Sequence, residues 1–159
     1  LLAQEGLPAE EIVAKVTAMI PLDNASFIID RLDYLHKGGR CSGLEAFGAS
    51  LLQIKPCIEV INGKMTVGKK YRGKLEHCLL RYVKDRLEGR EDIDYSRIFI
   101  THAACPAEIV EKVREAIRTY APFIEIIESF AGCTVSTHCG PKTLGILYKQ
   151  KPGFPKSLA

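Results

Sequence analysis

Apolar side chains recur at helical spacing in three stretches of the chain, residues 8–20, 74–88 and 106–120. In each stretch they fall on one face, which predicts three amphipathic helices. Pro8 suits the first turn of the first helix, and Pro21 ends that helix because proline cannot continue a helical backbone. Each of these helices therefore presents one apolar stripe.

Two shorter helices are expected between the first and the second of these. Residues 32–37 form one helical turn or a little more, because the Gly-Gly pair that follows suits the backbone just past a helix end. Ser42 and Glu45 match the capping-box pattern, which opens a helix over residues 43–52.

Short apolar runs predict the strands of a sheet. They occur at residues 25–30, 54–61, 64–71, 97–103, 122–129, 134–136 and 144–149. The pair Asn62–Gly63 joins the second and third runs, and an Asn-Gly pair in such a place is the strongest short-range signal for a β-hairpin. The order of the elements indicates a two-layer α/β fold in which helices pack on a mixed β-sheet. Residues 25–150 are expected to form this domain, with residues 151–159 as a loosely held tail.

Composition and charge narrow the classes of function. Hydrophobic residues make up 47% and charged residues 26% of the chain, as in an ordinary soluble domain. No apolar run approaches the roughly 20 residues of a membrane span, and the first residues do not match a signal peptide. Residues 64–90 hold nine basic and three acidic side chains, so this segment carries the positive excess of a chain whose net charge is +3. Nucleic acid is not an expected partner, because Tyr82 is the only aromatic residue on the basic helix that could stack on a base.

Six cysteines, at positions 41, 57, 78, 105, 133 and 139, are expected to be free thiols. No C-x-x-C pair occurs, Cys78 falls on an apolar stripe, and Cys57 lies within a predicted strand. This usage is typical of a reducing, cytoplasmic environment.

The segment STHCGP at residues 136–141 is the first candidate for chemistry. A tight loop is expected over residues 137–141, which would place His138 beside Thr137 and backbone N–H groups that could hold a carboxylate or phosphate. The alternative is a turn histidine bonded within its own loop, and spacing alone does not separate the two. Cys139 is not expected to act as a nucleophile with His138, because neighbours on an extended backbone point to opposite sides.

Two arginines are candidate anion ligands. Arg40 follows a predicted helix stop, where it could cap exposed carbonyl groups or clamp a carboxylate or phosphate. Arg72 stands at a strand-to-helix junction in the basic segment, where it could bind an anion or be one charge on a solvated face.

A metal site is not expected. The residue types that suit zinc are His102, Cys105, Cys133, His138 and Cys139. Their spacings match neither a zinc ribbon nor a zinc finger, and no phosphate-binding, dinucleotide-binding or serine-hydrolase motif occurs.

Residues 27–74 resemble the central signature of the DegV family. They contain a strand, a Leu-x-x-Leu turn, Gly-Gly-Arg, a helix, Ile-Lys-Pro and a hairpin that ends in an arginine before a helix. The S-T-H-x-G-P segment followed by Leu-Gly is similar to the second signature of that family. The resemblance covers nearly the whole chain and implies part of a two-domain cytoplasmic protein that binds a fatty acid. It also implies that the N-terminal domain is missing here and that residues 1–24, a helix and linker, belong with it.

The resemblance further implies roles for individual residues. A long-chain fatty acid would lie in the apolar interior with its carboxylate at the interdomain cleft, facing His138 beside Thr137. Arg40 and Arg72 would lie at or near the mouth of the cleft. The resemblance implies no cofactor and no catalytic residue in this chain, presentation of the fatty acid to a separate fatty acid kinase in some bacteria, and at most transient contact with a membrane.

Two positions depart from the family pattern, and two rival functions stay open. Ser136 and Lys142 stand where the family usually has glycine, and Lys142 could add a positive charge near the headgroup or crowd it. One rival is a small hydrolase or metal-dependent enzyme that uses His138 with Cys or His groups. The other is a structural interaction domain.

Overall fold

The computed structural model describes residues 1–37 and 54–154. Its helices are α1 (Ala9–Met19), α2 (Asp33–Lys37), α3 (Leu75–Leu87), α4 (Ala107–Tyr120) and α5 (Cys133–Cys139), with a short 3₁₀ turn η1 (Ile20–Leu22) after α1. Its strands are β1 (Asp23–Ile28), β2 (Ile54–Ile61), β3 (Lys64–Arg72), β4 (Ile93–His102), β5 (Glu125–Phe130) and β6 (Leu144–Gln150). The strands form one sheet in the order β3-β2-β1-β6-β4-β5, in which only the β4–β5 pair is parallel. The predicted α/β fold with helices on a mixed sheet is confirmed.

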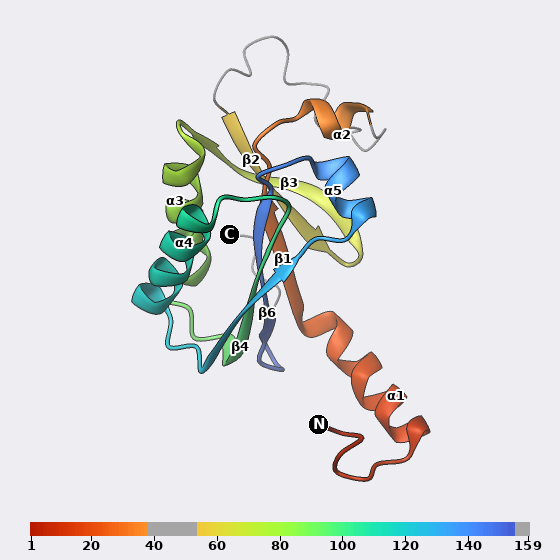
Figure 1. Cartoon of the computed structure of the whole chain (residues 1–159). Coiled ribbons are helices and arrows are strands. Elements are labelled where there is room, and N and C mark those ends of the chain that lie inside the picture. The colour runs from red at the N-terminus through yellow and green to blue at the C-terminus, as the bar shows by residue number, and fades with distance from the viewer. Residues whose placement is uncertain (38–53, 155–159) are drawn as a thin grey trace.

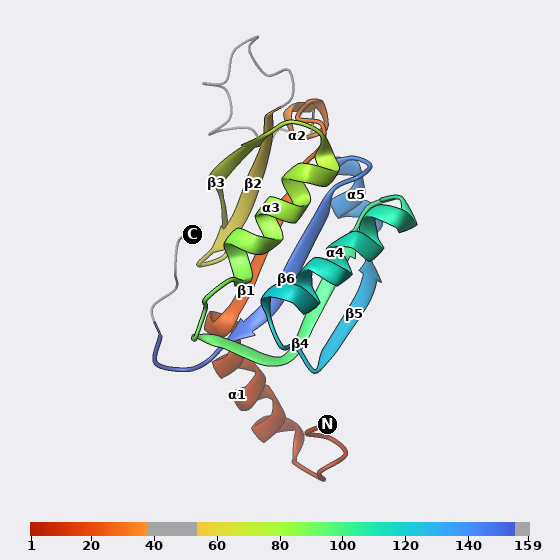
Figure 2. The ribbon, with the colours of Figure 1, turned by 90° about the vertical axis from the view of Figure 1, so that its left-hand side faces the viewer.

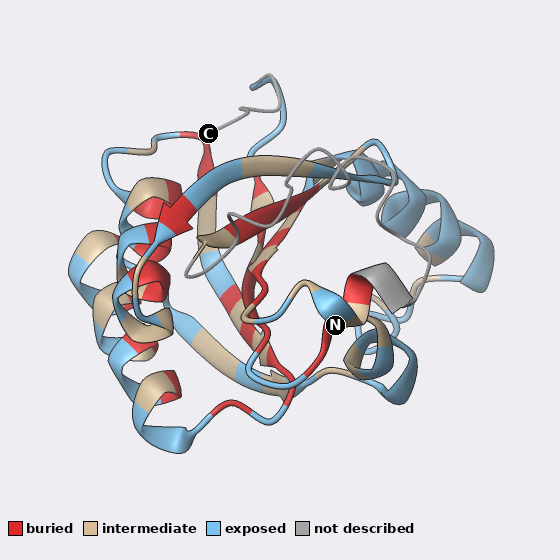
Figure 3. Cartoon of the chain, turned by 90° about the horizontal axis from the view of Figure 1, so that it is seen from above, coloured by how far each residue is buried: buried red, intermediate tan, exposed pale blue. Residues whose placement is uncertain are grey.

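Helices α3 and α4 lie side by side on one face of the sheet (Figure 1, Figure 2). Side chains of a strand alternate between the two faces, and those that point towards these helices form the core. The fully buried members of this core include Ile28, Ile98, Ile100 and Ile146 from the strands and Leu79, Val83, Val113 and Ile117 from the helices. Figure 3 shows the same distribution, with burial concentrated in the strands and on the inner sides of α3 and α4.

Several predicted boundaries are confirmed, and others shift. The β2–β3 hairpin turns at Asn62 and Gly63, whose φ angles of 51° and 74° are those that a two-residue hairpin turn requires. Strand β4 begins at Ile93 rather than at the predicted Arg97, because the chain pairs with β6 at Ile93 and Asp94 before a bulge. The helix predicted over residues 43–52 lies outside the described residues.

Helix α1 extends away from the sheet (Figure 1). It has no buried residue, and its apolar stripe is open: Val13 is 64% exposed and Ile20, which follows the helix, is 60% exposed. The pattern in the sequence therefore predicted the helix correctly, and the described residues leave most of its apolar stripe exposed.

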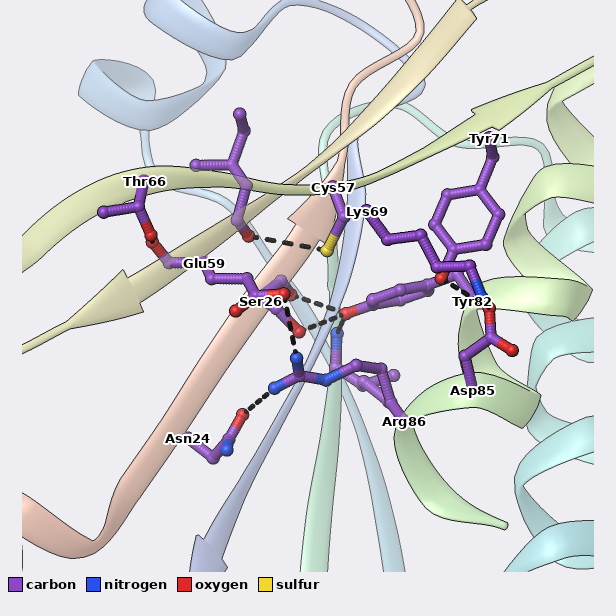
Figure 4. Close-up of polar contacts among 12 residues, drawn as sticks. Asn24, Ser26, Cys57, Glu59, Thr66, Lys69, Tyr71, Tyr82, Asp85 and Arg86 are labelled. Carbon is purple, nitrogen blue, oxygen red and sulfur yellow. Dashed lines mark hydrogen bonds and ion pairs between the residues drawn. The ribbon is translucent and has the colours of Figure 1, made fainter. Parts of the chain in front are cut away.

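The hydroxyl of Tyr82 joins α3 to two strands (Figure 4). It donates to the carbonyl of Ser26 in β1 (2.8 Å) and accepts from the backbone N–H of Ile146 in β6 (3.1 Å). A fully buried hydroxyl without partners would cost about 1–3 kcal/mol, so these bonds restrict where α3 can sit on the sheet.

A buried ion pair joins α3 to the sheet one helical turn further on (Figure 4). The Arg86 guanidinium lies 3.1 Å from the Glu59 carboxylate of β2 and donates to the Asn24 side-chain oxygen of β1 at 2.5 Å. The Arg86 and Glu59 side chains are only 3% and 6% exposed. Gly68 of β3 leaves the space that the Glu59 carboxylate occupies, because a Cβ there would lie 2.3 Å from a carboxylate oxygen. The charge of Arg86, the charge of Glu59 and the small size of Gly68 therefore depend on one another.

Arg86→Met is expected to lower the free energy of unfolding by about 3–5 kcal/mol, because it leaves the Glu59 carboxylate buried without its cation. Equilibrium urea unfolding followed by circular dichroism measures the change. Lys84→Met is the matched control on the same helix: Lys84 lies 3.7 Å from Glu88 at the surface, and its loss should cost less than about 1 kcal/mol. Equal losses in the two variants would show that the buried pair does not hold α3 in place.

Native alkylation with iodoacetamide at neutral pH should modify Cys133 and spare the buried thiols, because only the thiolate reacts. Burial raises the pKa of Cys57 to about 12 and that of Cys105 to about 11, and it also raises the pKa of Cys139. Peptide mapping by mass spectrometry reads out each site, and the urea-unfolded protein, in which all of them react, is the control. Rapid native modification of Cys139 would contradict its burial and would favour the thiol-enzyme alternative.

Candidate functional site

The sheet face opposite α3 and α4 carries partly exposed side chains in register across β1, β6 and β4. The first row, nearer to α5, consists of Phe27, Gly145 and Thr101. The second row consists of Ala25, Leu147 and Phe99. In each row the members lie directly opposite one another on neighbouring strands, so they form one continuous surface. Among the described elements, α2 and α5 lie towards one end of this surface and α1 at the other (Figure 1).

A hollow of about 330 Å³ opens over the first row and over Ala25 and Leu147 of the second row, and we call it the apolar trough. Phe27 and Leu147 line its floor, and Phe130 at the end of β5 and Val135 of α5 line its wall. Phe130 is 75% exposed and Val135 is 50% exposed. The volume lies at the lower end of the range for small-molecule sites, and uncovered aromatic and aliphatic side chains in a concave site are typical of ligand binding.

The polar groups beside the trough are bonded to one another. The Thr101 hydroxyl lies 2.8 Å from the Ser129 hydroxyl. His102 has its Nε2 3.2 Å from the Glu128 carboxylate, while its Nδ1 accepts the backbone N–H of Cys105 (3.3 Å). Because both ring nitrogens are engaged, His102 has no free nitrogen to act as a base on a substrate in this arrangement.

Residues 133–139 form the helix α5, so the predicted strand at residues 134–136 and the predicted tight loop over residues 137–141 are wrong. Gly132 is the N-cap of α5, and Gly140 follows its end with a φ of 80°, which suits a glycine. A Cβ at Gly140 would lie 2.5 Å from the ring of Tyr34 in α2, so the glycine also allows α2 and α5 to approach.

His138 lies in the last turn of α5 and is half-buried. Its Nδ1 is buried and has no hydrogen-bond partner among the described residues. His138 does not line the trough, but Val135, one turn earlier in the same helix, does. Cys139 follows on a helical rather than an extended backbone, so the reason given above for excluding a His138–Cys139 dyad is wrong; burial raises the pKa of the Cys139 thiol.

The other predicted site residues lie in different settings. Thr137 is exposed, and its hydroxyl donates to the carbonyl of Cys133 in its own helix (2.8 Å). Arg72 is the exposed last residue of β3, and its side chain forms no ion pair with the described part of the chain. Arg40 lies outside the described residues.

The backbone conformation of Lys142, one of the two departures from the family pattern, is one that favours glycine. Its φ is 64°, a conformation that glycine adopts without strain and other residues rarely adopt. Its N–H donates to the carbonyl of Ala103 (2.6 Å), which holds the turn after α5 against the end of β4. The side chain is exposed, so at this position the lysine adds a surface charge and does not fill the trough.

Two further findings limit what the described residues can form. No group of three or more His, Cys, Asp or Glu side chains is arranged to hold a metal ion within residues 1–37 and 54–154. None of the helices in this part of the chain is long and apolar enough to cross a membrane.

Sequence reasoning missed the residues that line the trough. Phe27 and Leu147 belong to runs that are apolar on both faces, a pattern that indicates two buried faces but not a ligand. Only the register, which brings strands from opposite ends of the chain together, shows that these side chains share one surface.

The chain is similar to known proteins over most of its length. The family model described as uncharacterised protein, DegV family, matches residues 1–151. A fatty acid-binding protein from Thermotoga maritima is 31% identical, in an alignment that covers 89% of this chain and 49% of the relative. The crystal structure of a DegV lipid binding protein from Thermotoga maritima matches with a TM-score of 0.73 and 25% identity, over 94% of this chain and 51% of that one.

A third protein shares the fold. The Streptococcus pneumoniae Fatty Acid Kinase (Fak) B3 protein, loaded with linoleic acid, matches with a TM-score of 0.79 and 22% identity, over 94% of this chain and 52% of that one. The chain thus spans about half the length of the curated relatives it matches. A family model that covers nearly every residue, together with the agreement in fold, shows that the chain belongs to the DegV family.

Proposed function

We propose that the chain binds a long-chain fatty acid, with the acyl chain in the apolar trough and the carboxylate beyond its α5 end. The observation that carries this proposal is the trough itself, an apolar hollow that the described residues leave open on the sheet of a member of the DegV family. Each methylene removed from water contributes about 0.8 kcal/mol, so a long aliphatic chain suits such a surface better than a polar substrate does. The relatives named for fatty acid or lipid binding support the same ligand class.

His138 is the proposed ligand of the carboxylate. A buried imidazole nitrogen without a partner is rare in proteins, and it suggests a group that the ligand supplies. An N–H at Nδ1 would donate to a carboxylate oxygen, and a hydrogen bond to a charged group is stronger than one to a neutral group. Thr137 is a second proposed contact, which requires its hydroxyl to turn from Cys133 towards the ligand.

Arg72 is proposed to act at the mouth of the site rather than inside it. Strand β3 runs antiparallel to β2, which runs antiparallel to β1, so Arg72 lies at the same end of the sheet as α5. Its exposed guanidinium suits an acidic partner or a phosphorylated headgroup. We propose that Arg72, together with Arg40, serves the hand-over of the fatty acid to a separate fatty acid kinase in the cytoplasm, without a cofactor in this chain.

Of residues 1–24, those up to Leu22 are proposed to pack on a second domain that closes the site, because Asp23 and Asn24 belong to β1 of this sheet. The open stripe of α1, with Val13, Val16 and Met19, supports this, because apolar helix stripes are normally covered. The relatives are about twice as long as the aligned region, which is consistent with a second domain.

Organic extraction of the protein, purified at the full length that its gene encodes, is expected to release fatty acid at a substantial fraction of one molecule per chain. The reason is that the trough leaves apolar surface which a resident lipid would remove from water. Gas chromatography with mass spectrometry identifies and quantifies the acid. Protein that contains no fatty acid and also takes up none when it is added would contradict the proposed function.

His138→Ala is expected to weaken fatty-acid binding about ten- to a hundredfold, because a hydrogen bond to a charged group contributes roughly 1.5–3 kcal/mol. Displacement of a fluorescent fatty acid measures the affinity. His77→Ala, which removes an exposed histidine of α3, is the matched control and should bind like the wild type. An unchanged affinity in His138→Ala would remove the histidine from the site.

Arg72→Ala is expected to leave retention of the fatty acid unchanged and to slow its phosphorylation by an added fatty acid kinase. The wild-type reaction should also be more sensitive to salt than that of the variant, because an exposed charge acts through screened electrostatics. Arg118→Ala, an exposed arginine of α4, is the control. Loss of bound lipid in Arg72→Ala, with His138→Ala unaffected, would show that the two roles are reversed.

A further inference from the structure

A second hollow of about 390 Å³ lies beside the apolar trough on the same face of the sheet. The two hollows share only Ala25 and Leu147, which are opposite one another on β1 and β6. Phe99, the third member of the second row, faces the second hollow. The second row is therefore the boundary between the two hollows.

The two hollows differ in chemistry. Beyond the second row the surface is charged: Lys149 lies 2.8 Å from Asp94, and Arg97 lies 2.6 Å from Glu125. A methyl end that entered this region would have to displace water from ion pairs without replacing their hydrogen bonds, which is unfavourable. An acyl chain that enters from the α5 end therefore gains more free energy up to the second row than beyond it, where charged groups border the hollow.

The distance between the two rows determines how many methylene groups of an acyl chain lie between them. Two residues along a strand correspond to about 7 Å, the length of several methylene groups. Ala25 is the smallest side chain of the second row and is partly exposed on this face, with Val60 and Leu147 as its cross-strand neighbours. Of the three members, it leaves the most room for the end of a ligand.

We infer that the second row, Ala25, Leu147 and Phe99, sets the maximum length of the acyl chain that the site accepts, and that Ala25 is its specificity-determining residue. This inference rests on the proposed function, since it assumes that the acyl chain lies in the trough. A larger side chain at position 25 closes the path between the two hollows. A smaller one at position 147 widens it.

The test measures the affinities of lauric, myristic, palmitic and stearic acid for the full-length wild type, Ala25→Leu and Leu147→Ala. Ala25→Leu should retain the affinity for lauric acid and lose affinity progressively for the longer acids, by about fourfold for each methylene that no longer finds apolar cover. Leu147→Ala should shift the preference towards the longer acids. Ala107→Leu, an exposed alanine at the start of α4, is the control and should keep the wild-type profile.

Two outcomes overturn the inference. In the first, the affinity of Ala25→Leu depends on the length of the acid as that of the wild type does. In the second, its affinity falls equally for all four acids, which indicates general damage to the site. Thermal unfolding of each variant without ligand shows whether the variant is folded. A shift of Leu147→Ala towards longer acids, opposite to that of Ala25→Leu, shows that the boundary itself has changed. A wild type that binds none of the acids overturns the proposed function itself, whereas a wild type that binds them with unchanged variant profiles overturns the inference alone.

Discussion

Helices α3 and α4 cover one face of the sheet, whereas the described residues leave the opposite face partly open beside α2 and α5, and the candidate site depends on that difference. Alternation along β1 and β6 buries Ile28 and Ile146 under the helices and turns Phe27 and Leu147 to the opposite side. The buried contacts of Arg86 restrict α3 to one placement on the covered face. The described residues leave Phe130 and Val135 of the apolar trough exposed, so this apolar surface needs a cover other than these two helices.

A ligand made of methylene groups meets that need more readily than a reacting substrate does. Two of the described side chains that could assist a reaction are engaged or buried: His102 bonds through both ring nitrogens, and burial raises the pKa of the Cys139 thiol. The Nδ1 of His138, one helical turn after Val135 of the trough wall, has no hydrogen-bond partner among the described residues, which suits a headgroup contact at the end of an apolar site. This division of an apolar body and a polar end matches the chemistry of a fatty acid.

The local sequence pattern predicted most helices and strands, but it did not predict the residues of the candidate site. The β2–β3 hairpin and helices α1, α3 and α4 follow from turn chemistry and periodicity that each segment carries by itself. For α5, the β-branched Thr134 and Val135 favoured the strand predicted over residues 134–136, but the bracketing glycines and the packing against α2 favoured a helix. Neither the trough nor the Arg86 network is local, because each depends on which strands become neighbours.

The placement of the acyl chain on the open face of β1, β6 and β4 is the central claim, and photo-crosslinking tests it most directly. A fatty acid that carries a diazirine near its methyl end would be bound to the full-length protein, irradiated and mapped by peptide mass spectrometry. We predict that the label attaches to the peptides that contain the second row, around Ala25, Phe99 and Leu147, and that excess palmitic acid removes it. Competed labelling confined to α3 and α4, with none on these strands, would contradict the account.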